Sequence, residues 1–161
     1  MRLLCDEMLA NLARWLRAAG HDTTLAEPGT PDATLIGLCR AERRVLITRD
    51  RQLVREAGDG IDSVLLTGEN PDAHAALLAD RLGLDWTKAP FTRCMLDNTP
   101  LRPAEEDEIA GIPPQSRVLP GPFRTCPCCG RVFWPGSHVR RMTAQLERWR
   151  AASPPVSAPE G

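Results

Sequence analysis

Two short cysteine-containing segments hold the clearest metal-binding pattern in the chain. Cys126 and Cys129 in TCPCCG have the spacing of one zinc-ribbon knuckle, and Gly130 permits the backbone turn that follows the second ligand. The segment RCMLDNTPL places Cys94 where another knuckle would begin, but Asp97 stands where its second cysteine is expected. A carboxylate oxygen binds zinc at about the same distance as an imidazole nitrogen. The four residues therefore predict a structural zinc site with one oxygen ligand.

Two other side chains could supply the fourth ligand in place of Asp97. Cys128 lies within the complete knuckle, and His138 lies in the following segment WPGSH. A redox-active Cys-x-x-Cys pair is the competing interpretation, but that motif is expected between a strand and a helix. Here the pair lies among prolines and arginines, before the strand-like run RVFW. Cys5 and Cys39 lie in apolar segments and are expected to be small core residues.

Three aspartates form a second candidate metal site. Asp6 follows the apolar run RLLC, Asp50 follows VLITR, and Asp32 lies at the start of the helical pattern PDATLIGLCRAERR. Ligands of open α/β sheets bind at the carboxyl ends of the strands, so these side chains are expected to converge. Clustered carboxylates can hold Mg²⁺ or Mn²⁺, which activates water for attack on a phosphodiester. Each aspartate could instead cap a helix, because Asp is a preferred N-cap residue.

The hydrophobic pattern predicts the scaffold that positions these groups. Apolar runs on both faces of short strands, alternating with helical periodicity, indicate a parallel sheet covered by helices. After Trp86 this alternation ends, and residues 101–123 keep neither helical nor strand periodicity for long. The expected strands are 2–6, 22–26, 45–48 and 63–67, and the expected helices are 7–19, 31–44, 50–58 and 70–83.

Composition divides the chain into three expected parts. Residues 1–90 form the α/β domain, residues 91–150 a zinc-ribbon module with a basic C-terminal segment, and residues 151–161 a disordered, Pro- and Ser-rich tail. The net charge of the chain is −1, but residues 117–150 contain seven arginines and only one acidic residue, Glu147. Such a basic segment is typical of a protein that binds a polyanion such as nucleic acid. A solubilising surface is the alternative.

The N-terminal sequence MRLLCDEML enters an apolar run at once and lacks the basic-then-apolar pattern of a signal peptide. No apolar run approaches the roughly 20 residues of a membrane span. Six cysteines in such a chain favour a reducing compartment, with metal ligands and core residues rather than disulfides. We therefore expect a cytoplasmic protein that does not contact a membrane.

Five segments between residues 2 and 142 follow one another in a recognisable order: LLCDEMLANLARWLRAAGHDT, PDATLI, RVLITRDRQL, the RC…N…L segment and TCPCCGRVFWPGSH. In order and spacing they resemble the Mut7-C ribonuclease domain, a PIN-like domain followed by a zinc ribbon. The DEMLxxLARWLR and WxGSH segments are specific to this pattern, whereas TRD alone is weak. The resemblance covers almost the whole chain except the tail.

The resemblance implies an α/β fold: a PIN-like three-layer sandwich with a parallel sheet, followed by a small zinc-ribbon module. It also implies a metal-dependent ribonuclease in which Asp6, Asp32 and Asp50 are catalytic and hold Mg²⁺ or Mn²⁺. Asp97 stands where the family pattern has cysteine. His138 matches the family's Gly-Ser-His segment, in which the second cysteine is also present, so it is expected to have another task, such as RNA contact.

Four arginines are further candidates for contact with single-stranded RNA. Arg14 and Arg51 flank the carboxylate segments, and Arg140 and Arg141 lie in the basic segment. A guanidinium can bind phosphate through two hydrogen bonds, although an ordinary exposed helix residue is the common alternative. Two other functions compete with the ribonuclease. One is a non-catalytic RNA-binding zinc-ribbon protein, and the other is a PIN-type toxin held by an antitoxin.

Overall fold

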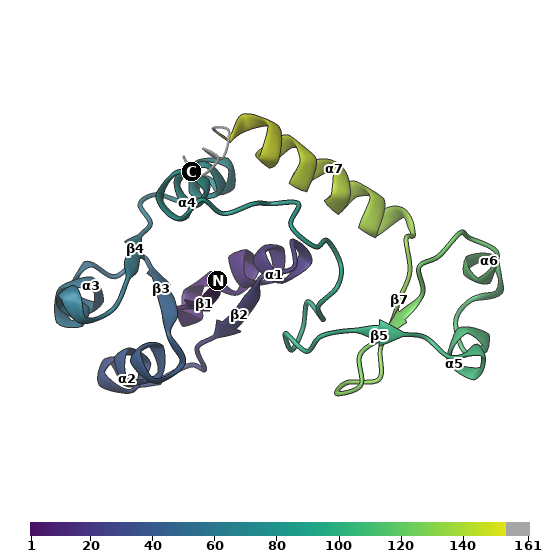
Figure 1. Ribbon diagram of the computed structural model, residues 1–161, viewed down its shortest axis with the longest axis horizontal. Coiled ribbons are helices and arrows are strands. Elements are labelled where there is room, and N and C mark those ends of the chain that lie inside the picture. The colour runs from purple at the N-terminus through teal and green to yellow at the C-terminus, as the bar shows by residue number, and fades with distance from the viewer. Residues whose placement is uncertain (154–161) are drawn as a thin grey trace, which may run out of the picture.

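A four-stranded parallel sheet forms the centre of the N-terminal half (Figure 1). The computed structural model describes residues 1–153. The order of the strands in the sheet is β2-β1-β3-β4, and every neighbouring pair is parallel. This confirms the expected α/β class and parallel sheet. The strands are β1 (Arg2–Cys5), β2 (Asp22–Leu25), β3 (Arg44–Thr48) and β4 (Ser63–Leu65).

Helices connect the strands close to the predicted positions. The first predicted helix begins with one 3-10 turn, η1, whose N-cap is Asp6. Among residues 1–153, no helix has both the length and the apolar character needed to cross a membrane. The connecting elements are η1 (Glu7–Leu9), α1 (Ala10–Ala18), α2 (Asp32–Glu42), α3 (Arg51–Ala57), η2 (Gly58–Gly60) and α4 (Pro71–Leu82).

The sheet is covered on both faces because its strands alternate between two apolar clusters. Leu3 and Cys5 of β1 belong to a cluster with side chains of α1 and α4. Leu4, between them in the sequence, belongs to a second cluster with side chains of α2 and α3. Successive side chains of a strand point to opposite faces, so this division follows from the strand period of two. Burial on both faces explains why the strands read as continuous apolar runs.

A second, antiparallel sheet contains strands β5 (Arg102–Pro103), β6 (Arg124–Thr125) and β7 (Val132–Phe133). The connection from β5 to β6 contains the short helices α5 (Glu106–Ala110) and α6 (Pro114–Arg117), where no lasting periodicity was expected. A capping box between Glu105 and Glu108 starts α5. Helices of five and four residues are too short for apolar periodicity to reveal them.

The C-terminal helix α7 (Ser137–Ala152) was not predicted from the sequence. Its buried residues Met142, Leu146 and Trp149 form a helical stripe, and Figure 1 shows the helix running from the second sheet back to α4. The expected domain boundary assigns this helix to the ribbon module, yet Leu146 and Trp149 belong to the core of the N-terminal half. The helix also includes residues 151 and 152 of the expected disordered tail. The rest of that tail, residues 154–161, lies outside the described residues.

Trp149 joins α7 to the core through two aromatic contacts and one hydrogen bond. Its ring centroid is 5.0 Å from that of Trp15 in an edge-on arrangement, and 4.8 Å from that of Trp86. Its indole Nε1 donates to Asp72 Oδ1 at 2.7 Å. Because only 7% of Trp149 is exposed, its removal would leave a cavity between α1, α4 and α7.

We predict that Trp149→Ala lowers the free energy of unfolding by about 3–5 kcal/mol, the usual cost of truncating a buried aromatic residue. Trp149→Phe keeps the ring contacts and loses the bond to Asp72, so it should cost only about 1–2 kcal/mol. Urea unfolding followed by circular dichroism measures both values. Equal losses in the two variants would contradict the packing role.

Asp22 connects three parts of the structure. Its carboxylate accepts hydrogen bonds from Arg44 Nη1 at 2.8 Å, from Asn98 Nδ2 at 2.8 Å and from Arg2 Nε at 3.3 Å. Burial by itself would raise the pKa of Asp22, but the bonds from Arg44, Asn98 and Arg2 outweigh it and lower the pKa from 3.8 to about 2. The ionised form therefore stabilises the fold.

The depressed pKa of Asp22 predicts a specific acid sensitivity. A carboxylate whose pKa is lower in the folded state stabilises the protein above its unfolded pKa, and this contribution disappears as the pH falls toward its folded pKa. Replacing Asp22 by Asn should therefore cost about 1–2 kcal/mol near pH 6 and progressively less from pH 4 toward pH 2. Urea unfolding at several pH values tests this, with the exposed Asp80→Asn as control. A pH-independent difference would show that the charge of Asp22 is unimportant.

Candidate metal centre and carboxylate edge

Cys94, Asp97, Cys126 and Cys129 come together in one cluster whose ligand atoms all lie within 4.8 Å of one another. The sulfur atoms of Cys94 and Cys129 are 3.8 Å apart, and Cys126 Sγ lies 3.4 Å from Asp97 Oδ2. Within residues 1–153 this is the one group of His, Cys, Asp and Glu side chains close enough to share an ion. These are the four residues that the sequence predicted as the zinc site.

The two turns that carry the ligands have the same backbone geometry. The amide of Asn98 donates to the carbonyl of Cys94, and the amide of Gly130 donates to the carbonyl of Cys126, both at 2.9 Å. Asn98 and Gly130 both have left-handed backbones, with φ of 71° and 75°. Glycine adopts this conformation without steric cost, and Asn is among the residues that tolerate it best. Asn98 therefore closes the first ligand turn as Gly130 closes the second. This role of Asn98 was not predicted from the sequence.

The two alternative fourth ligands are placed differently. Cys128 is exposed and lies outside the four-residue cluster. A hydrogen bond from its thiol to Asp97 raises the pKa of Cys128, so this side chain is a neighbour of the cluster. His138 also lies outside the cluster, and its Nε2 accepts a hydrogen bond from Arg14 Nη2 at 2.9 Å. Asp97 therefore completes the cluster better than either alternative.

Burial and hydrogen bonding shift the pKa values of two members of the cluster, Cys94 and Asp97. Burial raises the pKa of the Cys94 thiol to about 12. Burial would also raise the pKa of Asp97, but hydrogen bonds from Thr99 and from the thiols of Cys94 and Cys126 outweigh it and hold the carboxyl well below its usual range. A divalent cation would replace the thiol protons and satisfy the same donor atoms. Three sulfurs and one carboxylate oxygen can bind a metal such as zinc.

The first ligand turn is attached directly to the parallel sheet. Arg17, a buried residue of α1, donates to the carbonyls of Thr23, Met95 and Leu96 at 2.9, 3.2 and 3.0 Å. The side-chain oxygen of Asn98 accepts the backbone amide of Thr23 at 2.9 Å. The turn therefore occupies hydrogen-bonding groups of the edge strand β2, and the position of the metal cluster is fixed relative to the sheet.

Asp6 and Asp50 follow the adjacent strands β1 and β3, and Thr48 connects the carboxylate of Asp6 to the backbone amide of Asp50. Thr48 Oγ1 donates to Asp6 Oδ2 at 2.8 Å and accepts the backbone amide of Asp50 at 3.0 Å. Both aspartates are also N-caps: Asp6 accepts the amide of Glu7, and Asp50 Oδ1 accepts those of Gln52 and Leu53. The capping interpretation is thus correct for Asp6 and Asp50. It does not exclude a second role, because Asp50 Oδ2 takes part in neither cap bond.

Asp32 differs from the other two aspartates. Pro31 is the N-cap of α2, and Asp32 is the first helical residue, so its expected place as a cap was wrong. Its carboxylate forms no hydrogen bond within the part of the chain that is described. Burial raises the pKa of Asp32 first, followed by the charges of Glu56, Asp50 and Asp6. The three predicted carboxylates therefore lie within electrostatic reach of one another, although not as close together as the cysteine cluster.

Glu56 is a fourth acidic group near Asp6, Asp32 and Asp50, at the edge of the sheet where these carboxylates lie, and it was not predicted from the sequence. It lies in α3, six positions after Asp50, and its charge contributes more to the raised pKa of Asp32 than that of Asp50 or Asp6 does. Gln52 Nε2 donates to Glu56 Oε1 at 3.0 Å. In the sequence, the indication of this role was its position in the short helix that follows Asp50, about two turns after that aspartate.

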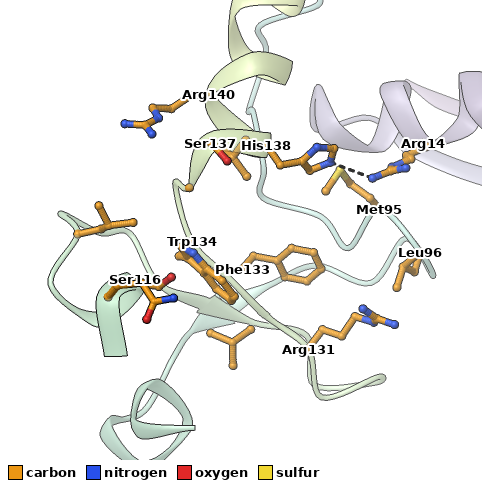
Figure 2. A pocket seen from close by; sticks show the side chains of 15 residues that line it. Arg14, Met95, Leu96, Ser116, Arg131, Phe133, Trp134, Ser137, His138 and Arg140 are labelled. Atoms are coloured by element: carbon orange, nitrogen blue, oxygen red, sulfur yellow. Dashed lines mark hydrogen bonds between the residues drawn. The ribbon is translucent and has the colours of Figure 1, made fainter. Parts of the chain in front are cut away.

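The predicted RNA contacts separate into two groups. Arg14, His138 and Arg140 line one cavity of about 560 Å³ between α1, β7 and the start of α7 (Figure 2). Arg51 lies in the first turn of α3 next to Asp50, and Arg141 lies on α7; neither lines that cavity. All four arginines have exposed side chains.

The comparison with known families is decisive for identity. The sequence model of the Mut7-C RNAse domain matches residues 1–146, which include both the carboxylate edge and the cysteine cluster. The chain belongs to the Mut7-C RNAse domain family. Neither the curated proteins nor the solved structures contain a significant match to it. For this Mut7-C domain, RNA is therefore the substrate class that the family indicates.

The cluster geometry predicts which residues of the Mut7-C domain would hold zinc. Asp97→Ala should release zinc to a chelator at least tenfold faster than the wild type, because one of four ligands is lost. Asp97→Cys should hold zinc more firmly, because thiolate is a softer ligand than carboxylate. Zinc transfer to a chromogenic chelator measures both rates. Cys128→Ser serves as the control, and release that depends on Cys128 but not on Asp97 would reverse the assignment.

Proposed function

We propose that this Mut7-C domain is a PIN-like, metal-dependent ribonuclease whose active site is the carboxylate edge formed by Asp6, Asp32 and Asp50. The observation that carries the proposal is the carboxylate of Asp32. It has no hydrogen bond among the described residues, and its pKa is raised first by burial and then by the charges of Glu56, Asp50 and Asp6. An acidic group kept near three others without a structural partner is typical of a cation site.

The donor atoms suit a hard divalent cation. All the candidate ligands are carboxylate oxygens, which Mg²⁺ and Mn²⁺ prefer, and the edge lies at the carboxyl ends of parallel strands, where α/β enzymes bind ligands. Bound there, Mg²⁺ or Mn²⁺ would supply a water of lowered pKa and neutralise charge on the scissile phosphate.

Different neighbouring groups orient the carboxylates of that site. Thr48 and the amide of Glu7 fix the carboxylate of Asp6, and the first turn of α3 fixes that of Asp50. The carboxylate of Asp32, at the start of α2, is not held by a hydrogen bond among the described residues. The exposed guanidinium of Arg51 stands beside Asp50, where it can contact a phosphate of the RNA.

The other expected features belong to the same proposal. The cysteine cluster would hold a structural zinc, and the module around it, residues 91–150, would assist RNA binding through His138, Arg140 and Arg141. All six cysteines are free thiols, which supports a reducing compartment such as the cytoplasm.

A non-catalytic RNA-binding protein is the second candidate, because Asp6 and Asp50 both have complete capping roles. In that case Asp6 and Asp50 serve only as helix caps, and the protein binds RNA without cleaving it. Cleavage assays separate the two functions, since a cap can be preserved while a charge is removed.

We predict that Asp6→Asn, Asp32→Asn and Asp50→Asn each reduce cleavage of labelled single-stranded RNA with Mg²⁺ or Mn²⁺ by at least a hundredfold. Asn is itself a good N-cap, so the free energy of unfolding should fall by no more than about 1–2 kcal/mol. Gel-resolved cleavage rates and urea unfolding provide the measurements, with Asp80→Asn as the matched control. Undiminished cleavage in all three variants would refute this active site, and no cleavage by the wild type would leave RNA binding as the function.

A further inference from the structure

A positively charged cavity is lined by none of the carboxylates of the proposed active site, but by His138 and Arg140, two of the residues proposed to assist RNA binding. Its volume is about 560 Å³, within the roughly 300–1,000 Å³ of ligand-binding pockets. It is bounded by α1, the first ligand turn, α6 and the loop after it, β7 and the first turn of α7. Figure 2 shows Phe133 and Trp134 in its middle, with Arg14, Arg131 and Arg140 at separate places around them.

The charge of this cavity is uniformly positive. None of the 15 described residues that line it is acidic, and three of them are arginines. Arg14, Arg131 and Arg140 form no ion pair with any carboxylate among residues 1–153. Uncompensated guanidinium groups around a concave surface attract an anion with more than one charge.

Trp134 lies outside the hydrophobic core, unlike the other three tryptophans. Trp15, Trp86 and Trp149 pack together in the largest apolar cluster, whereas Trp134 belongs to none of the three apolar clusters of the described residues. It is half-buried in the cavity wall. Such a ring offers a face on which a planar group can stack.

The segment WPGSH acquires a physical explanation from this cavity. Gly136 donates its amide to the carbonyl of Trp134 at 2.8 Å, and a Cβ at Gly136 would lie only 3.2 Å from the indole Nε1. Glycine therefore lets α7 start directly against the ring. His138, two residues on, accepts from Arg14 at 2.9 Å and holds that guanidinium at the cavity. Since arginine can only donate, Nε2 of His138 is the acceptor.

We propose that this cavity binds a segment of single-stranded RNA, with one base stacked on Trp134 and the neighbouring phosphates on Arg14, Arg131 and Arg140. Separate placement of the arginines suits successive phosphates of an extended strand better than one phosphate. Only an unpaired base can leave its stack to lie on an aromatic ring, so a duplex is excluded from this mode. The proposal rests on RNA being the substrate of the carboxylate edge, and it assigns to Arg131 and Trp134 the holding of the strand that is cut there.

Binding is tested in the Asp50→Asn background, zinc-loaded and without added Mg²⁺ or Mn²⁺, with a fluorescently labelled hexanucleotide RNA and a salt series. Arg131→Gln should weaken binding about tenfold and reduce the slope of log K against log salt by about 0.7, the value for one lost phosphate contact. Trp134→Ala should weaken binding about tenfold without changing the slope, because stacking is not electrostatic. Trp134→Phe should bind within about twofold of the parent, since it keeps an aromatic face.

Arg81→Gln, an exposed arginine of α4, is the matched charge control and should leave both affinity and slope unchanged. Parent-like affinity and slope in Arg131→Gln and Trp134→Ala would overturn the cavity proposal even if the wild type cleaves RNA. Duplex RNA that binds as tightly as the single strand, with the same sensitivity to Trp134, would also overturn it. Conversely, cavity-dependent binding with no cleavage by the wild type would refute the nuclease while the cavity stands.

Discussion

The hydrogen bonds of the buried Arg17 guanidinium attach the first ligand turn to the parallel sheet. A buried charge without partners is costly, and Arg17 finds three backbone carbonyls, one on β2 and two on the first ligand turn. The carbonyls of the ligand turn are thereby fixed relative to β2. Cys94 directly precedes Met95, so its position relative to the sheet is fixed as well. A candidate metal-binding segment that follows Trp86 in the sequence is thus attached to the edge of the sheet, and the hydrogen bond from the backbone amide of Thr23 to the side-chain oxygen of Asn98 reinforces this attachment.

The return of α7 completes this arrangement from the other side. Trp149 inserts between Trp15 and Trp86, so the C-terminal helix is held by the core of the N-terminal half rather than by its own sheet. The cavity around Trp134 is a consequence, because its walls come from α1, the first ligand turn, β7 and α7, which Arg17, Trp149 and the bond from Arg14 to His138 help to bring together. A change in the metal cluster would therefore alter the cavity as well, through Met95 and Leu96, which lie between the ligands Cys94 and Asp97 and line the cavity.

At the carboxylate edge, structural and chemical roles coexist on the same side chains. An aspartate that caps a helix presents at least one oxygen to the helix amides and is held in a fixed orientation, and orientation is what a metal ligand requires. Asp50 uses Oδ1 for the cap and leaves Oδ2 available. Asp32 has no such constraint. The edge therefore combines two fixed carboxylates with one adjustable carboxylate, next to the further acid Glu56.

The sequence by itself determined the local features of this protein. Strand and helix positions in the first 82 residues follow from residue periodicity, and the four residues of the cysteine cluster follow from ligand spacing, because both depend on neighbours within a few positions. Asp32, by contrast, lies one residue inside its helix, since Pro31 takes the cap position. Tertiary structure alone decided the rest: the course of α7, the approach of Glu56, the bond between Arg14 and His138, and the cavity around Trp134. Each of these depends on contacts between segments distant in the sequence, and no periodicity within a single segment records which distant surface it will meet.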